Sequence, residues 1–240
     1  MNFNPCIVSF YMDNIDKNVI KLQSLVVKKF NAANINHYLV KIDFPHGIAL
    51  DYFWAINGFK NERFANVDIK QQLEHNCILF LDIDCIPLSN KAIPMFFEAA
   101  QQGKIIGNAQ RSNHLQNNQH VFAAPSALCL SAETYTKIGM PCATENSRSD
   151  VAEEYTWEAE KLGVGVDLLM PLRYDNPPQR YDWEGNQPPY WALADGMPVY
   201  GMGTTYGTEA DGDLFYHNFQ IRMDGQQERF SEKCVEILQG

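Results

Sequence analysis

An unbroken apolar segment that ends in two aspartates constrains the fold of this chain more than any other feature. Cys77–Leu81 is apolar throughout, and Asp82 and Asp84 follow it directly. A run without alternation indicates a strand that is buried on both faces, as at the centre of a parallel sheet. Open α/β sheets bind their ligands at the carboxyl ends of such strands, so we expect the two aspartates to lie at a binding site.

The acidic pair indicates a metal or phosphate site. Asp82 and Asp84 are one residue apart, so both side chains point to the same side if the strand stays extended. Two like charges there need compensation, and their hard oxygens suit Mg²⁺ or Mn²⁺ bridging a diphosphate. A structural role is the alternative, because a short acidic pattern also arises by chance. The second such pattern, Asp211 and Asp213, lies in a polar stretch and is expected to be a solvated loop.

The bulk composition limits the classes of function. The chain has 240 residues, enough for one sizeable α/β core, and nothing in it requires a second domain. Its formal net charge of −10 argues against a nucleic-acid surface, which needs clustered lysine and arginine. A phosphate-bearing small substrate stays compatible with that charge, because a metal can supply positive charge locally.

The cysteines and the first residues bear on the compartment. The six cysteines show no CxxC spacing and lie mostly in apolar runs, which favours free thiols in a reducing compartment. Met1–Pro5 lacks a basic region followed by an apolar stretch, and no run approaches the ~20 apolar residues of a membrane span. We therefore expect no transmembrane segment and a cytoplasmic location.

Hydrophobic periodicity indicates an α/β fold with a mostly parallel, doubly wound sheet. The first half alternates strands and helices. The expected strands are 6–11, 37–43, 77–81, 104–109, 126–130 and 164–170, and the expected helices are 19–30, 49–58, 67–73, 92–100, 131–139 and 151–162. Residues 173–212 are rich in aromatics, proline and glycine, and we expect them to form a long functional loop region near the C-terminus, folded over the site.

Several segments together resemble the GT-A glycosyltransferases. Asp82 and Asp84 match the Asp-x-Asp of that family. The remaining matches are the segment Phe122–Ser131 with Tyr135 and Lys137–Gly139, the segment Ser149–Asp150 with a helix to Leu162–Gly163, and Leu214–His217. The resemblance covers about residues 5–222. It implies one Rossmann-like domain over 1–240, with a nucleotide-binding half at about 5–110, an acceptor-side half at about 111–222 and a C-terminal tail or helix at 223–240.

The resemblance implies a metal-dependent transfer of a sugar from a nucleotide-diphosphate donor. The acceptor would be a glycan, a lipid-linked molecule or another hydroxyl compound, and the cofactor Mn²⁺ or Mg²⁺. Asp84 is then the preferred direct ligand, Asp82 binds the metal through water or holds the ribose, and His217 is the third metal ligand. A metal would offset the charge that develops on the leaving diphosphate.

The remaining candidates are a base and groups that could contact the donor. Asp150 is the candidate general base, although a helix cap alone would also explain it, and Glu153 and Glu154 are alternatives. The family often has Glu where Ser149 stands. Contacts with the donor are expected from five residues besides Asp82. Phe10 and Tyr11 would contact the nucleobase, Asp43 the ribose or the edge of the nucleobase, and Lys60 and Arg63 the phosphates.

Other functions fit parts of the pattern. A phosphatase or phosphotransferase of the haloacid dehalogenase type also places Asp-x-Asp after an apolar strand, but its motif lies near the start of the chain. Sugar-nucleotide synthesis would need a glycine-rich basic loop where Tyr11–Asn14 stands. A non-catalytic module that binds a glycan or nucleotide is the third alternative.

Overall fold

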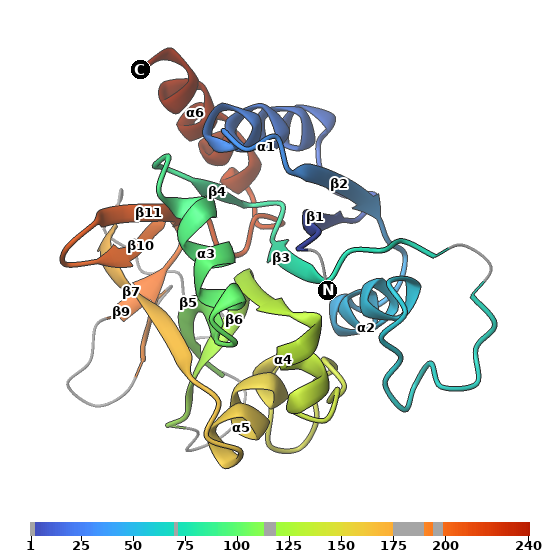
Figure 1. The fold of residues 1–240 in the computed structure, drawn as a ribbon. Coiled ribbons are helices and arrows are strands. Elements are labelled where there is room, and N and C mark those ends of the chain that lie inside the picture. Colours follow the sequence, from blue (N-terminus) through green and yellow to red (C-terminus); the bar gives the residue numbers. More distant parts are fainter. Residues whose placement is uncertain (1–2, 70–71, 113–118, 175–189, 194–198) are drawn as a thin grey trace.

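A nine-stranded mixed sheet forms the frame of the molecule in the computed structural model, which describes residues 3–69, 72–112, 119–174, 190–193 and 199–240 (Figure 1). The strand order is β2-β1-β3-β6-β5-β7-β10-β11-β4, and β8 and β9 pair separately. The strands are β1 (Pro5–Tyr11), β2 (Asn36–Lys41), β3 (Cys77–Leu81), β4 (Cys85–Pro87), β5 (Ile105–Arg111), β6 (Val121–Ser131), β7 (Val166–Tyr174), β8 (Tyr190–Ala192), β9 (Val199–Gly201), β10 (Thr204–Thr208) and β11 (Gly212–His217).

The expected α/β class is confirmed, and strand direction divides the sheet. β1 is parallel to β2 and β3, and β5 is parallel to β7. The pairs β3–β6, β5–β6, β7–β10, β10–β11 and β4–β11 are antiparallel. The first strands therefore bring their carboxyl ends to one edge, as in other α/β sheets that bind ligands there.

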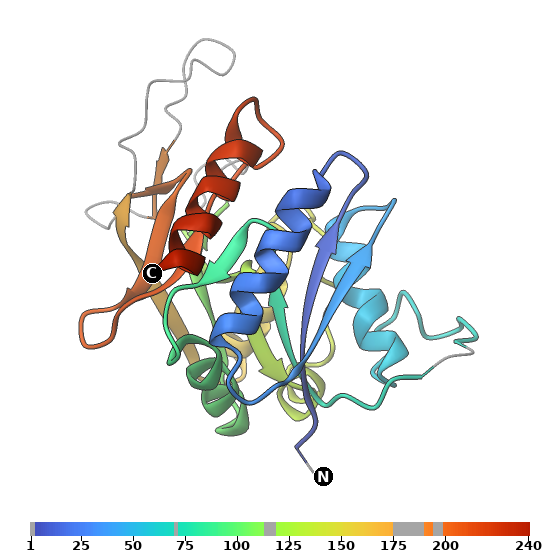
Figure 2. The same cartoon turned by 90° about the horizontal axis from the view of Figure 1, so that it is seen from above.

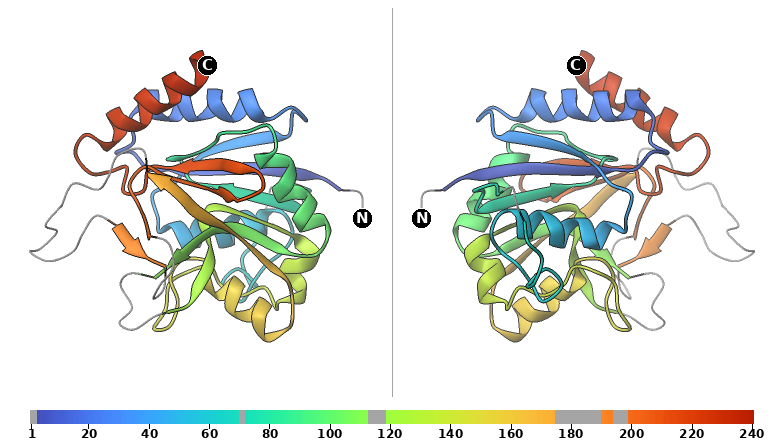
Figure 3. Two further views of the ribbon diagram at one scale, coloured as in Figure 1. Left: turned by 90° about the vertical axis from the view of Figure 1, so that its left-hand side faces the viewer. Right: turned by 90° about the vertical axis from the view of Figure 1, so that its right-hand side faces the viewer.

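Helices cover both faces of the sheet (Figures 1 and 3). They are α1 (Lys17–Phe30), α2 (His46–Ile56), α3 (Ala92–Gln101), α4 (Ala132–Lys137), α5 (Glu153–Lys161) and α6 (Gln226–Gln239). The alternation along β1 explains the two layers. Val8 and Phe10 pack with α2, α4 and α5, whereas Ile7 lies in the cluster on the other face with α3. On that second face α1 and α6 lie side by side (Figure 2).

Strand β3 is buried along its whole length, as its apolar run predicts. The backbone does not stay extended beyond it, so the condition under which Asp82 and Asp84 would point to the same side of a strand is not met. A turn begins at Asp82, where the Cys85 N–H donates to the Asp82 carbonyl oxygen at 2.9 Å. Strand β4 then pairs with β11 at the far edge of the sheet. The turn follows from charge, because carboxylates cannot continue a strand that is buried on both faces.

Three further expectations differ from the structure. The solvated loop expected at Asp211 and Asp213 is wrong for Asp213, which lies in β11 and accepts from the Thr205 hydroxyl at 2.9 Å. The helix expected at 67–73 is wrong, because the described residues of that segment have no helical turn. Within 173–212, the segment Thr204–Thr208 is strand β10 of the main sheet, and 175–189 and 194–198 lie outside the described residues. None of the described helices is both long and apolar enough to cross a membrane.

Replacing Gly47 by alanine should destabilise the fold. A Cβ at Gly47 in α2 would lie 2.7 Å from the Ala143 carbonyl oxygen and 2.7 Å from the Thr144 Cα, both of which are backbone atoms. Such overpacking costs about 1–3 kcal/mol of unfolding free energy, which urea denaturation would measure. Gly165→Ala is the matched control, since the three atoms nearest to its Cβ would all belong to the flexible Lys104 side chain. Equal effects of both substitutions would contradict this packing argument.

Candidate active site

A pocket of about 260 Å³ opens at the carboxyl ends of β1 and β3. Residues from seven segments surround it: the end of β1 and the loop after it, the loop after β2 with the start of α2, the turn after β3, β5, β6, the loop before α5, and the end of β11 with the loop after it. Its lining includes Phe10, Tyr11, Ile42, His46, Asp82, Asp84, Gln110, Pro125, Asp150, His217, Phe219, Gln220 and Arg222. The expected binding edge of the sheet is therefore hollow, and six of the predicted site residues lie on its wall.

Asp82, Asp84 and His217 form a cluster in which one potential ligand atom of each lies within 4.8 Å of the others. The His217 Nε2 lies 3.4 Å from the Asp84 Oδ1, and both side chains are nearly buried, at 5% and 9% exposed. Asp82 is more open, at 24% exposed. Two carboxylates and one imidazole are a donor set that suits a divalent cation such as Mn²⁺ or Mg²⁺.

Strand pairing brings His217 to the aspartates from far along the chain. In the antiparallel pairing of β4 with β11, His217 lies opposite Cys85, which directly follows Asp84. The Asn218 N–H donates to the Asp84 carbonyl oxygen at 2.9 Å and continues this pairing past the strand end. The turn after β3 is thus held on the segment that carries the histidine.

The cluster shifts the pKa of each of its members. Burial raises the pKa of Asp82, and the Asp84 charge adds to that rise, while His46, His217 and Arg222 oppose it. Burial also acts to raise the pKa of Asp84, but His217 and backbone N–H groups together hold it below its usual value. Burial acts to lower the pKa of His217, and the Asp84 charge and hydrogen bond outweigh it, so that pKa is raised. Asp84 and His217 therefore compensate each other's charge.

His46 and Arg222 lie in the pocket but were missed from the sequence. The His46 Nε2 lies 3.5 Å from the Asp82 Oδ1, and its ring meets the Phe10 ring edge-on at 5.6 Å between centroids. Its position at the start of α2, the helix that follows β2, is the signal that could have found it, because the carboxyl end of β2 also reaches this edge. Arg222 follows His217 by five residues, on the same loop.

Asp150 lies on the pocket wall and is not the N-cap of α5, which is Ala152 in a left-handed conformation at φ +64°. Its Oδ1 accepts from the Val151 N–H at 2.8 Å, and its own N–H donates to the Glu153 Oε2 at 2.7 Å. The two alternatives for the base are engaged elsewhere. Glu153 is fully buried and also contacts His120, and Glu154 binds Arg148 and Ser149.

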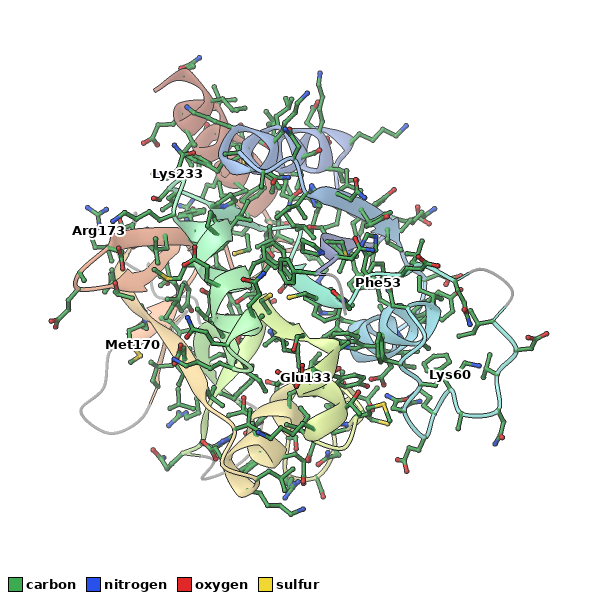
Figure 4. The ribbon with its side chains drawn as sticks, viewed as in Figure 1. Phe53, Lys60, Glu133, Met170, Arg173 and Lys233 are labelled. Atoms are coloured by element: carbon green, nitrogen blue, oxygen red, sulfur yellow. The ribbon has the colours of Figure 1, made fainter. Side chains whose placement is uncertain are left out.

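The remaining predicted donor contacts divide between two places. Phe10 and Tyr11 line the pocket, whereas Asp43 is exposed and is not among its lining residues. Lys60 and Arg63 line a second pocket, beyond α2, where Figure 4 labels Lys60. There the Lys60 Nζ donates to the Val67 carbonyl oxygen at 2.7 Å, and the Arg63 Nε lies 3.4 Å from the Asp51 Oδ2. The structure thus does not bring these two cations to the acidic cluster.

Comparison with known proteins gives likenesses of fold. No family profile and no curated protein matches the chain. It is similar to a glycosyltransferase involved in glycosylating the major capsid of PBCV-1 (TM-score 0.45, 11% identity, 97% of this chain and 100% of that one). It is also similar to the galactosyltransferase LgtC in complex with donor and acceptor sugar analogues (TM-score 0.40, 10% identity, 68% of this chain and 72% of that one). A third similar structure is a Drosophila β-1,4-galactosyltransferase 7 mutant in complex with manganese, UDP-Gal and xylobiose. Its TM-score is 0.39 and its identity 10%, and the match covers 68% of this chain and 64% of that one.

Identities this low and TM-scores below 0.5 carry no argument about the function of this chain. Its function has to be argued from the residues of its own pocket.

The ion pair that holds the Asp150 loop should give stability a pH dependence at low pH. The Arg148 hydrogen bond lowers the pKa of Glu154 to about 2, and Ser149 and Asn146 add to this. The pKa of a glutamate in the unfolded chain is about 4.3. Because the pKa of Glu154 is lower in the folded protein, its ionised carboxylate stabilises the fold at pH values above about 4.3, and this stabilisation is lost as the pH falls toward 2. After discounting for solvent, Glu154→Gln should cost about 2 kcal/mol near pH 7.

Urea denaturation of both proteins at several pH values would measure this. The difference between wild type and Glu154→Gln should be constant above about pH 5 and shrink toward zero near pH 2. Glu133→Gln, an exposed position on α4, is the control. A difference that does not change between pH 7 and pH 2 would show that the ionised carboxylate does not stabilise the loop.

Proposed function

We propose that this chain is a metal-dependent glycosyltransferase, which moves a sugar from a nucleotide-diphosphate donor to a hydroxyl acceptor. One observation carries the proposal. A potential metal-binding cluster (Asp82, Asp84 and His217) shares a pocket with a separate carboxylate, Asp150, at the carboxyl ends of β1 and β3. A cation site beside a base is what transfer from a diphosphate to a hydroxyl requires.

The donor set fits a divalent cation. Asp84 and His217 would bind it directly, and Asp82, the more exposed of the two aspartates, would bind it through water or hold the ribose. Among the described residues, no lysine or arginine makes an ion pair with Asp82 or Asp84, and the basic side chains beside them are the imidazoles of His46 and His217. When bound, the metal would offset the charge that develops on the leaving diphosphate.

Other pocket residues would hold the donor. Phe10, Tyr11 and Ile42 offer apolar surface for the nucleobase at the end of β1 and after β2. Arg222 is exposed at the pocket, and its charge acts on Asp82, so it would face the phosphate oxygens. This assignment replaces Lys60 and Arg63, which lie beyond α2.

Asp150 would take the proton from the acceptor hydroxyl. As the hydroxyl oxygen attacks the anomeric carbon, its O–H bond breaks, the proton passes to the carboxylate, and the bond to the diphosphate breaks. Direct displacement of this kind inverts the anomeric carbon. The Val151 N–H donates to Oδ1 and so orients the carboxylate toward the pocket it lines. The acceptor would be a glycan, a lipid-linked molecule or another hydroxyl compound.

Asp84→Asn should remove metal-dependent donor binding while the fold stays intact. Titration calorimetry with UDP and GDP, with and without Mn²⁺, would measure it. Loss of a direct ligand should weaken binding more than about 100-fold, since even outer-shell partners contribute 10–100-fold. Asp211→Asn is the control, because Asp211 stands in the other Asp-x-Asp and pairs with Lys91. Normal Mn²⁺-dependent binding by Asp84→Asn would overturn the metal assignment.

Asp150→Asn should slow catalysis without affecting donor binding. Loss of a general base lowers turnover about 10²–10⁴-fold. The measurement is metal-dependent release of nucleoside diphosphate from sugar nucleotides, with water as the acceptor, beside calorimetry of UDP and GDP. Asp43→Asn, at an exposed position outside the pocket lining, should leave both unchanged. A wild-type chain that binds a nucleotide and never hydrolyses a sugar nucleotide would instead support the non-catalytic module.

A further inference from the structure

The outward faces of α1 and α6 carry charges of opposite sign. Lys17, Lys21 and Lys28 stand on the exposed face of α1, which contains no acidic residue. Glu228, Glu232 and Glu236 are spaced by four residues on the exposed face of α6. Residues at these spacings share one side of a helix, so the three lysines line the outward side of α1 and the three glutamates that of α6, where Arg229 is also exposed.

Each stripe also holds one exposed aliphatic side chain. Leu25 on α1 is 40% exposed, and Val235 on α6 is 39% exposed. The buried residues of the two helices, such as Val26 and Phe230, lie on their opposite sides, in one core cluster beneath both. The stripes therefore point away from the sheet together, and Figure 2 shows both helices side by side on this face.

The two helices run in the same direction with a defined register. At one end the Gln227 side chain accepts from the Asp16 N–H at 2.6 Å, and at the other the Lys29 Nζ donates to the Ile237 carbonyl oxygen at 2.6 Å. Between these ends Lys17 lies level with Glu228 and Lys21 level with Glu232. Further along, Leu25 lies level with Val235 and Lys28 with Glu236.

Most of these charges have no partner within the chain. Among the described residues, Lys17, Lys21 and Lys28 make no ion pair, and neither do Glu228 and Glu232. Glu236 pairs with Lys233 of the same helix, at 3.2 Å. Lys17 and Lys21 on α1 and Glu228 and Glu232 on α6, unpaired and matched in register, are complementary to each other in a way that one copy does not use.

We propose that this face binds a second copy of the chain in a two-fold symmetric dimer. A two-fold axis that runs along the groove between α1 and α6 places α1 of one copy over α6 of the other, both running in the same direction. Lys21 then faces the partner's Glu232, Lys17 the partner's Glu228, and Leu25 the partner's Val235. Each contact occurs twice. These paired contacts oppose the repulsion between two copies that each carry a net charge of −10.

The size of the face implies a weak dimer. Two helices of 14 residues are each about 21 Å long and about 10 Å apart, which gives a footprint of roughly 400 Å² per copy. That is smaller than a standard specific interface and belongs with weak, transient contacts, so we expect a dissociation constant on the order of micromolar or weaker, and salt should weaken the binding further. The inference is independent of the proposed function, because the face lies on the helices and not in the pocket.

Charge reversal tests the arrangement by sedimentation equilibrium. Lys21→Glu places two glutamates opposite each other at both contacts, and Glu232→Lys places two lysines there. Each variant alone should dimerise at least about tenfold more weakly than wild type, because attraction turns into repulsion. An equimolar mixture of the two variants should recover the wild-type affinity, since every lysine again faces a glutamate.

A charge reversal away from this face serves as the control. Lys137→Glu, on the exposed side of α4, should dimerise like wild type. Thermal unfolding of each variant shows that the fold persists. The proposal is overturned if wild type stays monomeric at about 100 μM in low salt, where a micromolar dimer would dominate. It is equally overturned if both variants dimerise normally, if their mixture does not recover, or if Lys21 instead mediates binding of the monomer to vesicles of anionic lipid.

Discussion

The turn that ends β3 is the constraint on which the rest of the structure depends. Up to Leu81 the chain is buried on both sides, and at Asp82 it must leave the core because an ionised carboxylate cannot stay there unpaired. The turn carries the chain to the far edge of the sheet, where β4 pairs with β11. That single redirection joins the parallel half of the sheet to the antiparallel half and sets His217 beside Asp84. The site is thus a consequence of how a buried strand ends.

The two functional parts of the pocket are held in different ways. The Asp84–His217 pair is fixed by strand pairing, so its geometry is as rigid as the sheet. Asp150 stands on a loop, and the loop is fixed by two glutamates of α5. Glu153 accepts from the Asp150 N–H, and Glu154 binds Arg148 and Ser149. The first turn of α5 therefore orders the loop that would carry the base, which a helix dipole alone would not achieve.

The site residues that could be predicted from the sequence are those whose immediate neighbours in the chain make them unusual. Asp82 and Asp84 stand out because a charged pair interrupts a buried run, and His217 ends a short apolar strand. Arg222 carries no such local mark, and His46 is marked only by its place in the helix that follows β2; both reach the pocket because segments far apart in the sequence come together there. Lys60 and Arg63 were predicted as phosphate contacts, yet the loop after α2 leads away from the cluster. Strand direction was equally hidden, because the periodicity of β6 is the same whether it runs parallel or antiparallel to β3.

The charge of the pocket decides how an anionic donor could enter it. Three carboxylates line it, and His46, His217 and Arg222 are the basic groups among its described residues. Asp84 already engages His217 and Asp82 already faces His46, so little positive charge is left for a diphosphate. A cation held by the aspartates reverses that balance and would be bound more tightly once phosphate oxygens complete its shell. Metal and donor affinities must then rise together by the same factor, because the coupling between two ligands is reciprocal.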